Sequence, residues 1–159
     1  MNDEDYMRLA IAEARRAESL GEVPIGAVVV YEPIDRGTRR PLAEPRVISR
    51  ACNLRETTKN PAGHAEFLAM QEAARVLDAW RLSDCTVYVT LEPCPMCTGA
   101  IINSRIPCLV FGARDAVTGS CGSVIDLFFE NYGHHPKVYA GVLGDESAEL
   151  LRSFFKGLR

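Results

Sequence analysis

The chain has 159 residues, of which 47% are hydrophobic and 25% charged, and a formal net charge of −3 at pH 7. This size and composition predict one globular domain spanning residues 1–159. The acidic, amphipathic N-terminus is unlike a signal peptide, and no apolar run approaches the roughly 20 residues of a membrane span. We therefore expect a cytoplasmic protein with no membrane partner. The charge excludes a generally basic surface, so any nucleic-acid partner requires a local basic patch.

Apolar periodicity predicts helices and strands in alternation along the chain. Helices are expected over 3–20, 64–79 and 95–105, and strands over 23–31, 47–53, 85–91, 107–113 and 137–143. The segment VIDLFFENY (124–132) is expected to form a short amphipathic element, and a last helix is expected from about Glu146, with Asp145 as its N-cap. The segment 32–46, with three prolines and four arginines, reads as a long loop. The order predicts an α/β fold in which helices cover both faces of one sheet.

Two of the predicted helices begin at residues that can bind a metal. One opens with HAE (64–66), and the other begins within PCPMC (93–97). Cys94 and Cys97 are three residues apart, so they lie on one side of a first helical turn, where the helix dipole favours thiolates. A C-x-x-C pair alone is also compatible with a redox disulfide or with part of a zinc ribbon. The combination H-x-E…P-C-x-x-C matches the signature of zinc nucleobase deaminases.

The residue types in this signature suit a catalytic zinc site. One imidazole and two thiolates, from His64, Cys94 and Cys97, leave one position of a tetrahedral Zn²⁺ free for water. Zinc lowers the pKa of that water to about 7, so that hydroxide is available near neutral pH to attack the substrate. Glu66 points away from the metal ligands and is expected to carry protons between the water, the substrate ring and the departing amine. The alternative is a closed structural site, with a fourth ligand from Cys85, Cys108 or Cys121.

Five segments carry a resemblance to a known family. They are EVPIGAVVV, NLRET…HAE, YVTLEPCPMC, SRIPCLVFGARDAVTGSCGS and SFFKGLR. With them the chain resembles, over nearly its whole length, the bacterial tRNA-specific adenosine deaminases, which convert wobble-position adenosine to inosine. The first three segments are shared in looser form with free-base and nucleoside deaminases. The resemblance implies a three-layer cytidine-deaminase-like fold, with a mixed five-stranded sheet between helices, assembled as a homodimer. It also implies one Zn²⁺ per subunit and the tRNA anticodon stem-loop as partner.

The same resemblance implies several substrate contacts. Asn53 is expected to hydrogen-bond the flipped nucleoside, although an Asx-turn is the commoner role of such an asparagine, and Ala65 is expected to contact the substrate. Arg114 and Asp115 match positions that meet the anticodon backbone and a neighbouring ribose, where Asp115 would accept a hydrogen bond from a 2′-OH. The alternative for this pair is a solvated surface loop. The glycine-rich segment 112–123 lacks the G-K-[ST] of a phosphate loop, so no nucleotide cofactor is expected.

The last helix carries two adjacent aromatic candidates, Phe154 and Phe155. The resemblance suggests that one of them packs against anticodon nucleotides, but spacing does not separate the two, and core packing of both is the alternative. Two other functions also remain open. One is the same zinc chemistry on a free nucleobase or nucleoside of the guanine or cytosine type, because the form PCPMC is also frequent among those deaminases. The other is a non-catalytic zinc or thiol module.

Overall fold

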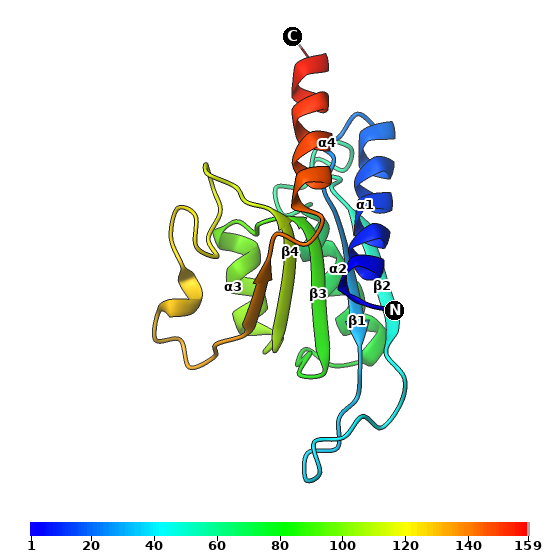
Figure 1. The fold of residues 1–159 in the computed structure, drawn as a ribbon, viewed down its shortest axis with the longest axis vertical. Helices are drawn as coiled ribbons and strands as arrows, with labels where there is room; N and C mark the ends of the chain where they lie inside the picture. Colours follow the sequence, from blue (N-terminus) through cyan, green and yellow to red (C-terminus); the bar gives the residue numbers. More distant parts are fainter. Residues whose placement is uncertain (159) are drawn as a thin grey trace.

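A five-stranded sheet with the spatial order β2-β1-β3-β4-β5 forms the centre of the protein (Figure 1), seen in a computed structural model that describes residues 1–158. The strands are β1 (Gly26–Tyr31), β2 (Arg46–Cys52), β3 (Cys85–Leu91), β4 (Cys108–Ala113) and β5 (Lys137–Ala140). β1 is antiparallel to both β2 and β3, whereas β3, β4 and β5 are parallel to one another. The mixed sheet implied by the resemblance is confirmed.

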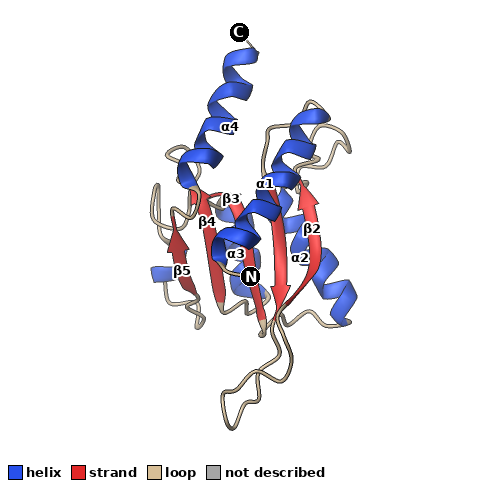
Figure 2. Ribbon diagram, turned by 45° about the vertical axis from the view of Figure 1, so that its right-hand side comes forward, coloured by secondary structure: helices blue, strands red, loops and turns tan. Residues whose placement is uncertain are grey.

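Four helices cover the two faces of this sheet. They are α1 (Asp3–Ser19), α2 (Ala65–Leu77), α3 (Pro95–Asn103) and α4 (Gly144–Gly157). Figure 2 shows α1 on one face and α2 and α3 on the other. Alternate residues of β1 serve two cores, since Ala27 and Val29 pack with α2 and α3, while Val28 and Val30 pack with α1 and α4. None of the helices within residues 1–158 is long and apolar enough to cross a membrane.

The first helix begins and ends as its sequence predicts. The Asn2 side chain accepts a hydrogen bond from the Asp5 N–H at 2.9 Å, and the Asp5 carboxylate accepts one from the Asn2 N–H at 2.8 Å. This reciprocal capping box satisfies two N–H groups at the start of α1. At the other end Gly21 has φ of +79°, a conformation that favours glycine and ends the helix.

Three predicted elements differ near the C-terminus. The last helix begins at Gly144 with Leu143 as its N-cap, so the prediction that Asp145 caps it was wrong. Asp145 instead lies in the first turn, where its charge suits the helix dipole. The fifth strand ends at Ala140, because the chain turns at Gly141 with φ of +86°. The segment 124–132 forms only a short 3-10 turn, η1 (Leu127–Phe129).

The segment 32–46 forms the expected loop up to Arg46, where β2 begins. An isolated antiparallel bridge pairs Ile34 with Pro41 within this loop. In Figure 1 the loop extends beyond the lower end of the sheet, whereas α4 extends beyond the upper end. The loop is therefore far from the strand ends that carry the site described below.

Gly26, at the start of β1, offers a test of the packing between the sheet and α1. A Cβ on Gly26 would overlap the backbone of Ala10 and Ala14. Gly26→Ala is expected to lower the free energy of unfolding by about 2 kcal/mol or more, because helix backbone cannot move aside as a flexible side chain does. Gly99→Ala in α3 is the matched control, since nothing lies within 4 Å of an added Cβ there. It should be neutral or stabilising by up to about 1 kcal/mol. Urea denaturation of both variants makes the comparison, and equal effects would contradict the packing described.

Candidate active site

The site lies at the edge of the sheet where β2, β3 and β4 end and β1 begins. Cys52, the last residue of β2, pairs with Gly26, and Val89 near the end of β3 pairs with Ala27. Because β1 is antiparallel to both neighbours, the chain leaves β2 and β3 at the same edge. The helices that follow these strands, α2 and α3, therefore both direct their N-termini to this edge. The register of β1 thus determines where the two motifs meet.

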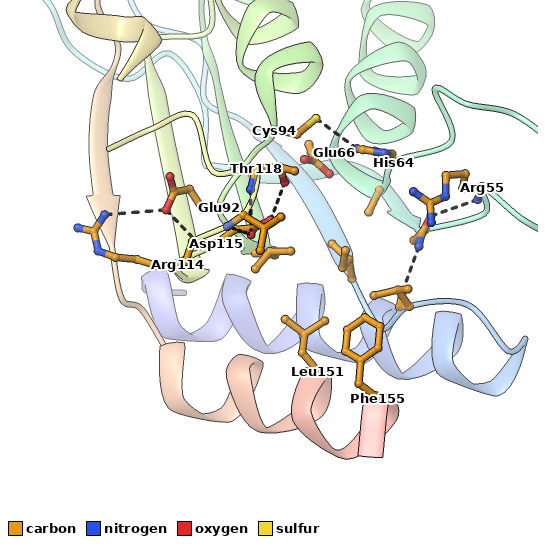
Figure 3. Close-up of a pocket in the computed structure, with 17 residues that line it drawn as sticks. Arg55, His64, Glu66, Glu92, Cys94, Arg114, Asp115, Thr118, Leu151 and Phe155 are labelled. Atoms are coloured by element: carbon orange, nitrogen blue, oxygen red, sulfur yellow. Dashed lines mark hydrogen bonds and ion pairs between the residues drawn. The ribbon is translucent and has the colours of Figure 1, made fainter. Parts of the chain in front are cut away.

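His64 and Cys94 are the N-cap residues of α2 and α3, and neither side chain caps its own helix. Both side chains instead point toward each other (Figure 3). His64 Nδ1 lies 3.5 Å from Cys94 Sγ and 3.6 Å from Cys97 Sγ. Tetrahedral zinc, with bonds of about 2.3 Å to sulfur and about 2.1 Å to nitrogen, holds such atoms about 3.6 Å apart. The three side chains therefore fit Zn²⁺ as a donor set.

A fourth protein ligand is not part of this cluster. Within residues 1–158, the group of His, Cys, Asp and Glu side chains close enough to share a metal consists of His64, Cys94 and Cys97. Cys85 and Cys108 begin β3 and β4 and so lie at the opposite edge of the sheet. Cys121 is nearer, but its Sγ lies 3.3 Å from the Thr98 hydroxyl in a buried contact. The arrangement favours a metal with an open position over a closed structural site.

The two thiols share one negative charge in the absence of a cation. A hydrogen bond from Cys97 lowers the pKa of Cys94 to about 4. The contact with Cys94, together with burial, raises the pKa of Cys97. The same Cys94 thiolate raises the pKa of His64 through their hydrogen bond. Metal ligands must be deprotonated, so a divalent cation would release the remaining proton and convert the trio into two thiolates and a neutral imidazole.

Glu66 lies in the first turn of α2 and is only 4% exposed. In Figure 3 its carboxyl group lies beside the contact between His64 and Cys94. Burial raises the pKa of Glu66, because the charged form loses its hydration. A raised pKa makes the carboxyl group a better proton acceptor than an ordinary glutamate, which is a property required of a general base.

A pocket of about 510 Å³ opens from this cluster to the surface. Its lining includes the predicted residues Asn53, Ala65, Glu66, Arg114, Asp115 and Phe155. The other aromatic candidate, Phe154, is not part of the lining and packs edge-on against Phe155, with 5.4 Å between ring centroids. Phe155 is 49% exposed, so one face of its ring is available to a ligand. The structure thus separates two neighbours that the sequence did not.

Asn53 forms the Asx-turn that was considered for it, and it also lines the pocket. Its Oδ1 accepts a hydrogen bond from the Arg55 N–H at 3.1 Å, which is an Asx-turn, and its Nδ2 donates to the Val23 carbonyl at 3.3 Å. The amide is 5% exposed and also lines the pocket. One further lone pair and one further N–H remain on the amide, so it can hold its turn and contact a ligand at once.

Two buried glutamates were missed by the sequence analysis: Glu92, which lines the pocket, and Glu22, which directly precedes the lining residue Val23. Glu92 accepts hydrogen bonds from the backbone N–H groups of Asp115, Cys121 and Ser123, at 3.3, 3.1 and 3.1 Å. Glu22, 1% exposed, accepts from the Thr57 N–H at 2.5 Å and from the Thr57 hydroxyl at 2.8 Å. Each glutamate directly borders an apolar strand segment, EVPIGAVVV or YVTLEP, and that placement is the signal that could have indicated a buried charge.

Arg55 was also missed, although it is only two residues after Asn53 in the sequence. Its side chain lines the pocket across from Arg114, and both guanidinium groups are at least half exposed. Two adjacent histidines, His134 and His135, lie in the loop before β5. His134 and His135 each contact a backbone carbonyl at 2.6 Å, that of Ile106 and that of Phe128 respectively.

Known proteins are similar to this chain in both fold and sequence. The family model of the MafB19-like deaminases matches residues 1–159. The tRNA-specific adenosine deaminase of Bacillus subtilis (strain 168) is 46% identical over 158 residues, which are 99% of this chain and 91% of that protein. A solved structure from a study of A-to-I editing by tRNA:A34 deaminases is 39% identical with a TM-score of 0.80, over 92% of this chain and 99% of that one. A guanine deaminase from Bacillus subtilis is 27% identical with a TM-score of 0.62, over 100% of this chain and 94% of that one.

The sheet order and the His-Cys-Cys cluster define a deaminase with a cytidine-deaminase-like fold. The chain belongs to the MafB19-like deaminases and, among them, to the family of the tRNA-specific adenosine deaminases.

Proposed function

We infer that the protein converts adenosine to inosine at the wobble position of tRNA. One observation carries this conclusion: a metal-binding trio and a buried glutamate meet in a pocket of about 510 Å³, in a chain that is 46% identical to a tRNA-specific adenosine deaminase. The volume suits a nucleoside, since ligand pockets typically measure about 300–1,000 Å³. The target base has to leave its loop to reach such a pocket, as in other enzymes that act on a base.

We propose that His64, Cys94 and Cys97 hold one Zn²⁺ per chain. Zinc in such a site lowers the pKa of a water to about 7 and so supplies the nucleophile for hydrolysis. The protein contributes the environment of that chemistry. Both ligand-bearing segments are helix N-termini, whose dipoles offset part of the negative charge of two thiolates.

Glu66 is proposed to move the protons of the reaction. It accepts a proton from the attacking water and delivers it to N1 of the purine, then takes the second proton from the new C6 hydroxyl and gives it to the departing amine. One water is consumed, the C6–N bond breaks, and ammonia leaves while C6 becomes a carbonyl carbon. Asn53 would hold the nucleoside through its remaining donor and acceptor, and Ala65 forms the adjoining pocket wall. The apolar side chains of Val23, Ile25 and Leu91 would exclude bulk water around the base.

The rim of the pocket supports RNA as the substrate. Arg55 and Arg114 place a cation on each side of the opening, which is the local positive charge that a chain of net charge −3 requires to bind a polyanion. Asp115 accepts hydrogen bonds from Val117 and Thr118 in its own loop, at 2.7–3.2 Å. A carboxylate has capacity for further donors, so a ribose 2′-OH can be added to this set.

Glu66→Gln tests the proposed reaction. Its amide cannot accept the proton of the attacking water, so we expect inosine formation in tRNA to fall at least about 100-fold. Zinc content, measured by elemental analysis, should remain one per chain because the three ligands are unchanged. Digestion of the treated tRNA to nucleosides, with mapping of inosine, makes the measurement. Unedited tRNA from zinc-loaded wild-type protein would contradict the function, and ammonia release from free guanine without RNA would favour a free-base deaminase.

Phe155→Ala and Phe154→Ala test the aromatic contact as a matched pair. We propose that the exposed Phe155 ring stacks on a splayed anticodon nucleotide, whereas Phe154 supports it from behind. Loss of one such stack should raise KM for tRNA by about tenfold, in line with about 1–3 kcal/mol per stacked base. Phe154→Ala should raise KM much less. Steady-state kinetics on an anticodon stem-loop distinguishes them, and a larger effect at Phe154 would reverse the assignment.

We also propose that the protein is a homodimer. An apolar groove of about 330 Å³ between α2 and α3 is lined by Phe67, Met70 and Trp80, and Trp80 is 63% exposed. Exposed apolar surface of this kind favours a protein partner over solvent. Sedimentation velocity should give twice the chain mass, and Trp80→Glu should shift the protein toward monomer. Phe129→Glu, an equally drastic change on η1 outside this groove, should leave the dimer intact. A wild-type monomer would contradict the proposal.

A further inference from the structure

Glu92 is a buried charge with no close cation. Its side chain has no exposed surface, and Arg114 Nη1 approaches Oε1 only to 3.9 Å while remaining 61% exposed. An ionised carboxylate in such a place is costly unless hydrogen bonds replace its hydration. Four hydrogen bonds do so, and all four donors belong to residues 115–123, which we call the substrate loop.

The four donors come from both ends of the substrate loop. Oε1 accepts from the Asp115 N–H and the Ser123 hydroxyl, and Oε2 accepts from the N–H groups of Cys121 and Ser123. Between these ends Gly119 passes directly over the carboxylate, so that a Cβ on Gly119 would overlap Glu92. The Glu92 side chain therefore joins both ends of the substrate loop. We call this set of four hydrogen bonds the clasp, and it fixes the backbone of Asp115 at the pocket rim.

The same loop is tied to the segment that carries the metal ligands. Glu92 is two residues before Cys94, and its N–H donates to the Ala113 carbonyl at 2.8 Å. The Ser120 N–H donates to the Pro93 carbonyl at 2.9 Å, and Cys121 Sγ contacts the Thr98 hydroxyl on α3 at 3.3 Å. The position of the substrate loop is thus coupled directly to the turn that carries Cys94 and Cys97.

We propose that Glu92 is a positioning residue that holds Arg114 and Asp115 at a fixed place relative to the metal ligands, and that it thereby sets the affinity for RNA. The inference rests on the proposed function, because it assigns the substrate loop to RNA binding. Glu92 touches neither the metal cluster nor the substrate in this account and acts through the loop. Its loss should therefore weaken binding of RNA while the chemical step, supported by Glu66, continues.

Glu92→Gln is the direct test. The amide has nearly the same shape, but its NH₂ group would face N–H donors, so part of the clasp is lost. We expect KM for tRNA to rise about tenfold with kcat within about threefold, because hydrogen bonds to a charged acceptor are replaced by weaker or repulsive contacts. Zinc content should be unchanged. A fall in kcat with KM unchanged would overturn the proposal.

A second readout needs no substrate. Amide hydrogen exchange at Asp115, Cys121 and Ser123, followed by NMR on the zinc-loaded protein, should accelerate at least about tenfold in Glu92→Gln. Glu22→Gln is the matched control, since it removes an equally buried carboxylate whose hydrogen bonds go to Thr57 and not to the substrate loop. It should accelerate exchange at Thr57 and leave the three loop amides as they are. Unchanged exchange at these amides in Glu92→Gln would overturn the clasp whatever the kinetics show.

Ser123→Ala tests the same proposal independently, in case Glu92→Gln does not fold. It removes only the hydroxyl donor to Glu92 and should raise KM by about threefold, the size expected for one hydrogen bond, with zinc content preserved. Wild-type kinetics and exchange in Ser123→Ala would count against the proposal. Failure of the proposed function has a different signature, namely no inosine from the wild type, while the exchange results would still report on the clasp.

Discussion

The convergence of two helix N-termini at one edge of the sheet is the constraint on which the site depends. Antiparallel pairing of β1 with both β2 and β3 sends the chain out at the same edge twice, so α2 and α3 begin side by side. Their N-cap residues, His64 and Cys94, leave their own helices uncapped and approach each other to 3.5 Å. Two helix dipoles then face a donor set with two thiolates, and the Glu66 carboxyl group follows in the first turn. The register of the sheet thus determines where the metal-binding residues and Glu66 come together.

Two buried carboxylates hold the loops next to the pocket in place. Glu22 holds the loop that leads to His64 through Thr57, and Glu92 holds the substrate loop through four hydrogen bonds. Each charge is costly to bury, and each is stabilised by donors from an otherwise irregular segment. Loops of this kind lose little further freedom when a ligand binds, because their conformation is already set. The arrangement suits a site that must receive a base extruded from RNA.

The fold and the metal site follow from local features of the sequence. Continuous β-branched runs predict the strands, and the positions of HAE and PCPMC place every ligand at the N-cap or in the first turn of a helix. The hydrogen bonds between Glu92 and the substrate loop could not be predicted in this way, because Glu92 and its donors are separated by 23–31 residues and only the folded chain brings them together. The start of α4 was misplaced because its N-cap, Leu143, adopts a left-handed conformation with φ of +50° that leucine rarely takes. Phe154 and Phe155 are neighbours on one helix, so the docking of α4 decides which of them reaches the pocket.

X-ray absorption at the zinc edge tests the central claim most directly. The zinc-loaded protein should contain one metal per chain, bound by two sulfur atoms, one imidazole nitrogen and one light atom from solvent. That result would place an open coordination position beside Glu66. A sphere of three sulfur atoms, or one closed entirely by protein side chains, would contradict the account.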